Sequence, residues 1–377
     1  MNDREVAELR RRLRPNQCNI THVRGCYVGE SGEILSEFDQ SLGLLGEEES
    51  EHLLSVLRKT LSGKSGRNLM DITFSTRQVA DSDEHRLLMR LRESALQDDE
   101  SVHALYQKVI DAAEWEGSYL ILLAHDRYDV PWRGKDGRRQ DDAGDQVFSY
   151  LLCAVCPIKL TRPALSYQMQ EQPFYLRRVD WLVSPPALGF LFPAFDERST
   201  NLYGALYYSK STTEAYEAFV DAVFHTQPPM PADAQRETFQ NLLAQSLDDE
   251  CRYGVVQAVN DELCTLIEDH RASRDPEPLA VSKETVRHVL ENCGVSEQHV
   301  ATFSVQFDEQ FGAEAQLRPD NLVDSRQFRV RSGEDVVIQV NPLRSDLVET
   351  RIIDGRKYIL VRAEDGVSVN GVDVDIS

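Results

Sequence analysis

The most apolar part of the chain consists of two short runs on either side of a polar segment. The runs cover residues 117–125 and 147–160 and are rich in branched and aromatic side chains, whereas residues 126–145 are polar and include Gly134, Gly137 and Gly144. Short apolar runs bounded by Gly, Pro or Asp are typical of strands that are buried on both faces. We therefore predict two central, antiparallel strands joined by an exposed loop.

Amphipathic helices and further strands flank this central pair. The spacing of apolar side chains and the stop residues Pro15 and Gly63 predict helices over residues 4–14 and 47–61, with others over 84–93, 100–113 and 213–224. Further strands are predicted over residues 19–28, 34–38, 69–74, 174–183, 189–195 and 202–208. Because strands and helices do not alternate regularly, the predicted class is α+β, with a mainly antiparallel central sheet and flanking helices.

A proline-rich segment at residues 228–231 predicts a domain boundary. The expected domains are residues 1–227, which hold the central sheet, and residues 232–377. The second domain is expected to begin with two acidic helices, over residues 232–247 and 251–271, and to continue with two short helices that open at Ser282 and Ser296. The tail from Phe328 predicts β-hairpins, with strong turn signals at Asp354-Gly355, Asp365-Gly366 and Asn370-Gly371.

The composition of the chain indicates which classes of protein are compatible with it. A hydrophobic content of 41% allows a sizeable core, and a net charge of -22 argues against a broadly basic nucleic-acid surface but not against a local basic patch. No apolar run reaches the roughly 18 residues of a membrane span, so we expect no membrane segment. The charged start predicts a helix rather than a signal peptide, and the seven scattered cysteines predict reduced thiols in a cytoplasmic protein.

Positive charge is concentrated in a few places. Arginines crowd residues 10–14, a second cluster lies in the loop between the central strands, and a third alternates along a C-terminal strand. The Gly63-Lys64-Ser65 turn is not a phosphate-binding loop, because Arg58 stands where the first glycine is needed and a helix precedes it. The candidate nucleic-acid-binding residues are Lys64, Arg67, Arg138, Arg139, Arg326, Arg329 and Arg331. A solvated surface is the alternative interpretation of each cluster.

Two polar places are candidates for a site. His125 and Asp126 end the first central run, and Asp196 and Arg198 lie in a polar turn between apolar strands. Turns held by rigid strands often carry binding residues. A hydrogen-bonded packing histidine and an ordinary turn are the favoured interpretations of the same residues.

Motifs for metal or covalent chemistry do not occur. Cys153 and Cys156 fall inside an apolar strand, where positions i and i+3 face opposite sides, which predicts buried structural thiols. There is no metal-binding histidine motif and no nucleophile elbow. We therefore expect no metal, no cofactor and no catalytic residue.

Several segments resemble a bacterial family known only as domain of unknown function 4317. They include Cys18-Asn-Ile-Thr, Cys153-Ala-Val-Cys-Pro, Gly189-Phe-Leu-Phe-Pro-Ala-Phe and Gln339-Val-Asn-Pro, and the resemblance covers nearly the whole chain. The family name implies no activity. The order of elements is also similar to the 37-kilodalton type of bacterial nucleoid-associated protein, whose apolar strand ending in His and Tyr-Leu-Leu-x-Ala-Val strand would fall at residues 117–125 and 150–155. That similarity implies a non-enzymatic, DNA-associated protein.

Three functional hypotheses remain. The first is a cytoplasmic nucleic-acid- or nucleoid-associated protein that binds DNA through its arginine clusters, with strong salt dependence. The second is an interaction or scaffold protein whose acidic helices, near residues 237–268, contact protein partners. The third is a hydrolase or nuclease that uses His125, Asp196 or nearby carboxylates, and it is disfavoured because no catalytic spacing occurs. A homodimer stays open under each hypothesis.

Overall fold

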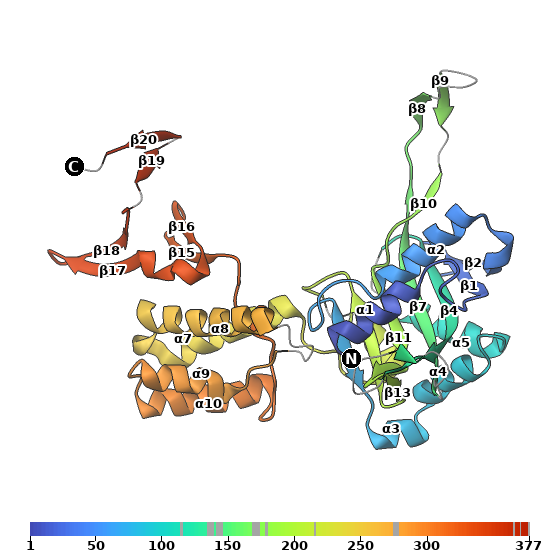
Figure 1. Ribbon diagram of the computed structural model, residues 1–377, viewed down its shortest axis with the longest axis horizontal. Helices are drawn as coiled ribbons and strands as arrows, with labels where there is room; N and C mark the ends of the chain where they lie inside the picture. The colour runs from blue at the N-terminus through green and yellow to red at the C-terminus, as the bar shows by residue number, and fades with distance from the viewer. Residues whose placement is uncertain are drawn as a thin grey trace. The chain divides into compact units, whose positions relative to one another are not determined.

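The structure is a computed structural model that describes residues 1–113, 116–133, 139–140, 146–167, 174–177, 180–214, 216–273, 279–364, 366–369 and 371–375. The chain forms two compact units, Met1–Ala232 and Asp233–Ser377, called unit 1 and unit 2 (Figure 1). Helices flank a mainly antiparallel sheet in unit 1, and helices precede β-hairpins in unit 2, so the predicted α+β class is confirmed.

Unit 1 is built on one antiparallel sheet with the strand order β2-β1-β4-β7-β11-β14-β3. The strands of the unit are β1 (His22–Val28), β2 (Ile34–Ser41), β3 (Leu69–Thr73), β4 (Tyr119–Val130), β5 (Trp132–Arg133), β6 (Arg139–Gln140), β7 (Gln146–Leu160), β8 (Ala164–Tyr167), β9 (Phe174–Arg177), β10 (Trp181–Val183), β11 (Leu188–Phe192), β12 (Ala194–Asp196), β13 (Ser199–Asn201) and β14 (Gly204–Ser209). The predicted central pair is β4 and β7, which are antiparallel from Tyr119↔Pro157 to Val130↔Gln146.

Strand β4 extends further than its apolar run. We predicted a loop from residue 126, but Asp126, Tyr128 and Val130 are buried and alternate with less buried neighbours. This two-residue period is the pattern of a strand whose one face packs on a core. The strand therefore continues into the polar segment, and part of the predicted loop lies outside the described residues.

Helices cover both faces of the sheet. The helices of unit 1 are α1 (Asp3–Arg12), α2 (Glu47–Lys59), α3 (Thr76–Asp81), α4 (Asp83–Glu93), α5 (Asp99–Asp111) and α6 (Glu217–Phe224), with a short 3-10 turn, η1 (Leu42–Leu44). One core joins α4, α5 and α6 to alternate sheet residues such as Leu123, and the other joins α1 and α2 to the residues between them, such as Leu122. Cys153 and Cys156 lie in opposite cores, as their spacing predicts.

A two-stranded arm continues from the sheet. Strand β10 pairs with the end of β7, and β8 pairs with β9 to form the top of the arm (Figure 1). The single strand predicted over residues 174–183 is wrong, because its two ends pair with different partners. The arm exposes large apolar side chains, with Trp181 at 58% and Leu160 at 57%.

Unit 2 combines a helical core with β-hairpins. Its elements are α7 (Ala232–Leu247), η2 (Asp248–Glu250), α8 (Tyr253–Ser273), α9 (Lys283–Asn292), α10 (Glu297–Phe311), α11 (Pro319–Leu322), β15 (Phe328–Ser332), β16 (Val336–Val340), η3 (Pro342–Leu347), β17 (Val348–Ile353), β18 (Arg356–Val361), β19 (Val367–Val369) and β20 (Val372–Val374). Ser282 and Ser296 are the N-caps of α9 and α10, as predicted. Among the described residues, no helix has both the length and the apolar character needed to cross a membrane.

Candidate functional site

His125 and Asp126 do not share a site. They are neighbours on β4, so their side chains point to opposite faces of the sheet. Asp126 lies on the face covered by α1, and His125 lies on the face covered by α4. The two residues must therefore be considered separately.

Asp126 is a buried carboxylate that is fully engaged. Its side chain is 0% exposed and accepts hydrogen bonds from the Tyr150 hydroxyl at 2.7 Å, the Asn19 amide at 2.8 Å and the Arg127 amide at 2.9 Å. The Arg12 guanidinium is 3.5 Å away and stacks over the Tyr128 ring, 3.9 Å from its centroid. Burial, together with the nearby carboxylate, raises the pKa of Tyr150 well above its usual value. With every partner inside the protein, Asp126 anchors α1 to the sheet.

The same network continues to Arg198. The guanidinium of Arg198 forms an ion pair with Glu8 and donates to the Pro131 carbonyl at 3.0 Å, while its backbone amide donates to Glu5 at 3.2 Å. Glu8 also accepts from the Tyr128 hydroxyl at 2.6 Å. The carboxylates of Glu5 and Glu8 therefore point inward, and the positive charge of Arg198 is neutralised inside unit 1.

Asp196 is also held by neighbouring groups. It accepts from the Asn201 side chain at 2.6 Å and lies 2.8 Å from the Met1 amino group. The two turn residues between β12 and β13, Glu197 and Arg198, have φ angles of 48° and 60°, as a tight hairpin turn requires. The contacts of Asp196 and Arg198 thus stabilise this hairpin and attach it to α1.

His125 forms a pair with Ser149 across the central strands. Its Nε2 atom is 2.8 Å from the Ser149 hydroxyl, and the Arg92 Nε donates to the Ser149 carbonyl at 2.7 Å. Burial lowers the pKa of His125, so the imidazole is neutral near pH 7. A serine nucleophile also needs a group that orients the histidine and donors for an oxyanion. Within the part of the chain that the structure describes, no carboxylate hydrogen-bonds to His125, so the pair is a packing contact.

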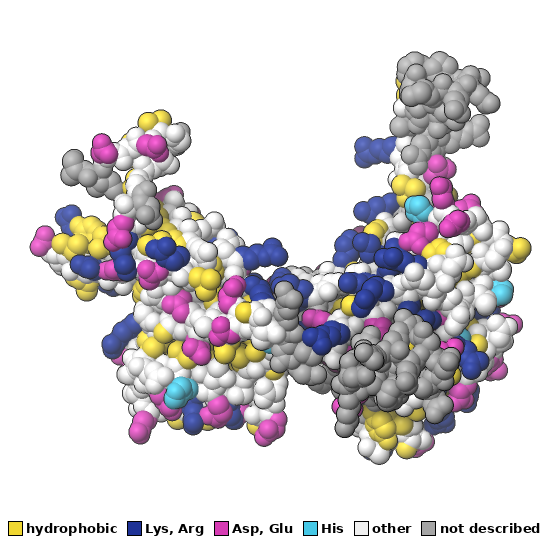
Figure 2. Space-filling view, viewed as in Figure 1, with side chains coloured by type: hydrophobic (Ala, Val, Ile, Leu, Met, Phe, Trp, Pro, Cys, Tyr) yellow, Lys and Arg dark blue, Asp and Glu magenta, His cyan; other side chains and the backbone are white. Residues whose placement is uncertain are grey.

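The surface of α1 is cationic because its charges are sorted by side. Glu5 and Glu8 face the sheet, whereas Arg4, Arg10 and Arg11 on α1, and Arg14 just after it, are exposed. Asp3, at the start of the helix, is its exposed carboxylate. Figure 2 shows Lys and Arg side chains gathered over this part of unit 1. The exposed residues of this surface, which we call the cationic face, are Arg4, Arg10, Arg11, Arg14, Lys59 and Lys64, with the half-buried Arg67.

Two contacts bring the rest of the cationic face to α1. The Ser65 hydroxyl donates to Asp3 at the start of α1, which places the loop of Lys64 and Arg67 there. The Arg58 guanidinium donates to the Leu13 carbonyl at 3.1 Å, which places the end of α2 beside the end of α1. The structure therefore joins two sequence clusters that are about 50 residues apart.

The other predicted nucleic-acid-binding residues fall elsewhere. Arg138 lies outside the described residues, and only the backbone of Arg139 is described, in β6. Arg329 and Arg331 are exposed on one face of β15, with the Arg329 guanidinium 3.1 Å from the Gln339 amide oxygen, but Arg326 precedes the strand and does not share that face. The prediction that the three alternate along one strand is therefore wrong for Arg326.

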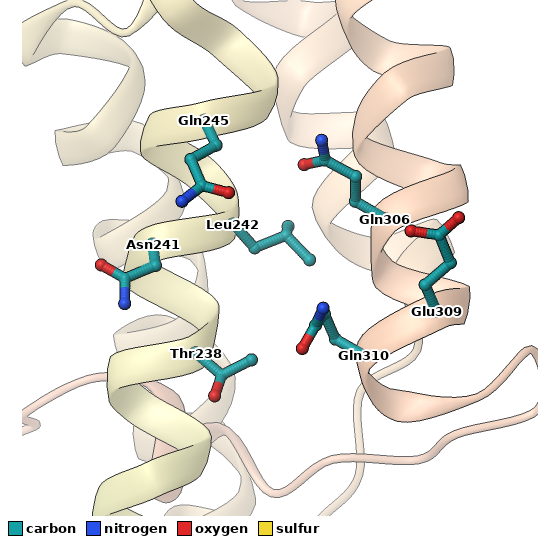
Figure 3. Close-up of a pocket in the computed structure, with 7 residues that line it drawn as sticks. All are labelled: Thr238, Asn241, Leu242, Gln245, Gln306, Glu309 and Gln310. Carbon is teal, nitrogen blue, oxygen red and sulfur yellow. The ribbon is translucent and has the colours of Figure 1, made fainter.

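Unit 2 contains an open groove between α7 and α10. It has a volume of about 350 Å³, and Leu242 and the amides of Gln306 and Gln310 point toward one another across it (Figure 3). This surface, which we call the amide groove, is lined by Thr238, Asn241, Leu242, Gln245, Gln306, Glu309 and Gln310. The groove was not predicted from the sequence, although two amide side chains lie four residues apart on each helix, Asn241 and Gln245 on α7 and Gln306 and Gln310 on α10.

Metal chemistry finds no support in the described part of the chain. No group of three His, Cys, Asp or Glu side chains there is arranged to hold a metal ion. A second hollow, of about 500 Å³, lies beside β7 and is lined by Arg198, whose charge is matched by Glu8. Neither hollow has the paired titratable groups that general acid–base chemistry needs.

Comparisons with known proteins identify one match. A family model described as a domain of unknown function (DUF4317) matches residues 1–372. No curated protein matches the chain, and no solved structure matches it either. The comparisons thus agree with the family predicted from the sequence and give no support to the similarity with nucleoid-associated proteins.

Proposed function

The chain belongs to the DUF4317 family, and because that description assigns no activity, we propose from the structure that the protein binds nucleic acid without catalysis, through the cationic face of unit 1. The observation that carries the proposal is the sorting of charge on α1. Glu5 and Glu8 are used internally, so the outer surface of the helix carries Arg4, Arg10 and Arg11, with Asp3 as its exposed carboxylate.

A local cationic surface is unusual in a chain with a net charge of -22. Acidic proteins repel nucleic acid over most of their surface, so binding depends on a place where positive charge is concentrated. Arg10 lies in the last turn of α1 and Arg14 follows the helix, and neither forms an ion pair with another described residue. They are therefore available to phosphate groups without breaking an internal contact.

The expected binding mode is electrostatic and independent of sequence. Arginine side chains on an exposed helix contact phosphate oxygens, which positions a nucleic acid but does not discriminate between bases. Each phosphate contact adds about -0.9 to the slope of log K against log salt for duplex DNA. Three arginine contacts therefore predict a slope contribution of about -2.7, or roughly 40-fold weaker binding between 50 and 200 mM salt.

The test is a titration of the full chain against fluorescent double-stranded and single-stranded DNA at both salt concentrations. The variant removes the arginines with no structural ion pair, Arg10→Ala, Arg11→Ala and Arg14→Ala together. A matched control removes Arg86, Arg287 and Arg344, which are about half exposed and form surface ion pairs of little energetic value. Binding that the first variant loses and the control retains supports the proposal. Absence of binding at 50 mM salt refutes it.

Protein partners of the acidic helices, the second hypothesis, stay a prediction.

A further inference from the structure

The base of the arm in unit 1 carries a tryptophan that is open to solvent. Trp181 of β10 is 58% exposed, and Leu160, its cross-strand partner on β7, is 57% exposed. An edge contact with Tyr27 holds the indole in place, with the two ring centroids 5.6 Å apart. An exposed indole and its apolar neighbour keep water-accessible surface that a ligand or partner can bury. The base of the arm is therefore a candidate binding surface.

Trp181 lies on the same side of the sheet as the cationic face. Tyr27 is paired with Leu120 on β4, and Leu120 packs against the core that α1 and α2 cover. Cross-strand partners share one side of a sheet, so the Tyr27 ring and the indole that contacts it lie on that side. Leu160 gives the same result, because it is four residues along β7 from Cys156, which belongs to that core.

Backbone and side-chain contacts connect the cationic face to the base of the arm. Its Lys64 loop meets the end of β14, where the Asn68 side chain donates to the Ser209 carbonyl at 3.1 Å. The next residue, Lys210, is exposed, and its amide donates to the Ala187 carbonyl at 2.8 Å, a few residues after β10. Figure 2 shows Lys and Arg side chains from this part of unit 1 up to the base of the arm. Positive charge therefore leads from α1 toward Trp181.

The arm adds cations of its own. Lys159 and Arg162 lie on either side of Leu160 in the chain, are exposed, and form no ion pair with another described residue. In a chain with a net charge of -22, this combination of cations and an open aromatic ring is complementary to an anionic ligand with flat apolar groups.

A single-stranded nucleic acid has these properties. In a duplex the bases are paired and stacked inside, so an indole on a surface cannot reach their faces without unstacking them. A single strand leaves base faces open, and stacking on an aromatic side chain is tolerant of sequence because every base has a π-face. We propose that the cationic face and Trp181 together bind single-stranded nucleic acid, with the phosphates on the cations and an unpaired base on the indole. This inference rests on the proposed function and names its ligand.

Strand β7 gives the length of such a site. The Arg12 guanidinium of α1 is 3.5 Å from Asp126, which pairs with Tyr150 of β7. Trp181 pairs with Leu160, ten residues further along the same strand. At about 3.3 Å per residue, the path from α1 to the indole is about 33 Å long. It corresponds to about ten nucleotides at the 3.4 Å spacing of a duplex strand, and to fewer in a more extended single strand.

The test compares a single-stranded DNA of about 20 nucleotides, which is longer than this path, with a duplex of the same sequence, in titrations of the full chain at low salt. Trp181→Ala should weaken binding of the single strand at least about fivefold, the lower limit for the loss of one stacked base, and leave binding of the duplex unchanged. Trp181→Phe keeps an aromatic ring and should retain most of the binding, whereas Trp181→Leu keeps only apolar bulk and should behave like Trp181→Ala. Tyr203→Ala is the matched control, because it removes an aromatic side chain that is 47% exposed just before β14.

The outcomes separate this inference from the proposed function. Absence of binding to both probes refutes the proposed function, and this inference with it. Binding that the variant of Arg10, Arg11 and Arg14 loses but Trp181→Ala retains, or an equal loss for both probes in Trp181→Ala, overturns the inference alone. A lower mass of the free chain in Trp181→Ala, measured by light scattering, would assign the arm to a second copy and also overturn it. A single-stranded RNA of the same sequence distinguishes the two sources of the ligand, since a loss with only one of them assigns that one.

The fluorescence of Trp181 reports the contact directly. Trp115→Phe with Trp132→Phe leaves Trp181 as the remaining tryptophan of the chain. Stacking on a base should quench its emission when the single strand is added, and the duplex should not. Unchanged emission at a saturating concentration of the single strand would refute the contact between the indole and a base.

Discussion

Replacing Asp126 by Ala tests the network that holds α1 against the sheet. The carboxylate is 0% exposed, and its removal leaves the Tyr150 hydroxyl and the Asn19 and Arg127 amides without their acceptor. The Arg12 guanidinium, 19% exposed, also loses its counter-charge. Breaking a buried charged pair from one side typically costs about 3–5 kcal/mol, because the remaining groups stay desolvated. We expect a loss of that size in the free energy of unfolding of unit 1.

Tryptophan fluorescence during urea unfolding can follow this unit alone, since all three tryptophans, Trp115, Trp132 and Trp181, belong to unit 1. A loss of about 3–5 kcal/mol lowers the urea midpoint by roughly 1–2 M. Tyr150→Phe is the matched control, because it removes only one hydrogen bond and should cost about 1–2 kcal/mol. An Asp126→Ala midpoint within 0.3 M of wild type, on the order of the measurement error, would show that the network does not stabilise unit 1.

Two further predictions concern the sheet. Gly189→Ala should destabilise unit 1 by about 1–3 kcal/mol, because an added Cβ would lie 2.4 Å from the Cys153 carbonyl oxygen and 2.7 Å from the Thr60 side chain; an unchanged urea midpoint would contradict this. Burial raises the pKa of the Cys26 and Cys156 thiols to about 12 from 9.0. The folded state then keeps protons that the unfolded chain releases above pH 9, so stability should fall between pH 9 and 12, by up to about 1.4 kcal/mol per pH unit for each thiol. Equal midpoints at pH 8 and pH 10.5 would refute it.

The central sheet could be predicted because its signal is local. The apolar runs over residues 117–125 and 147–160 are typical of buried strands. In the same way, the Asp354-Gly355 sequence is a turn signal that by itself predicts the β17–β18 hairpin. Strand β4 was predicted too short because its outer half is buried on one face only. The alternation of Asp126, Tyr128 and Val130 carried that information, but the charged residues between them suggested a loop.

The candidate site could be predicted only in part. The alternation of side chains along a strand already implies that His125 and Asp126 face opposite sides of the sheet. The pairing of Asp126 with Arg12, or of Arg198 with Glu8, joins residues more than 100 positions apart and has no local signal. The arginines of α1 were visible as a cluster, but their exposure follows from where Glu5 and Glu8 find their partners.

The strands of the arm could not be predicted either, because their pairing partners have no local signal in the sequence. Its segment 174–183 has the composition of one strand, yet β9 pairs with β8 and β10 pairs with β7. Strand boundaries here depend on which partner each half meets, and pairing partners are a property of the whole fold.

The most direct test of the proposed function is the salt dependence of DNA binding for the wild-type chain and for the variant with Arg10, Arg11 and Arg14 replaced by Ala. If the cationic face binds phosphates, the slope of log K against log salt should be less steep in the variant by about 2.7. Parallel slopes, or binding that the variant retains in full, would show that Arg10, Arg11 and Arg14 do not contact nucleic acid.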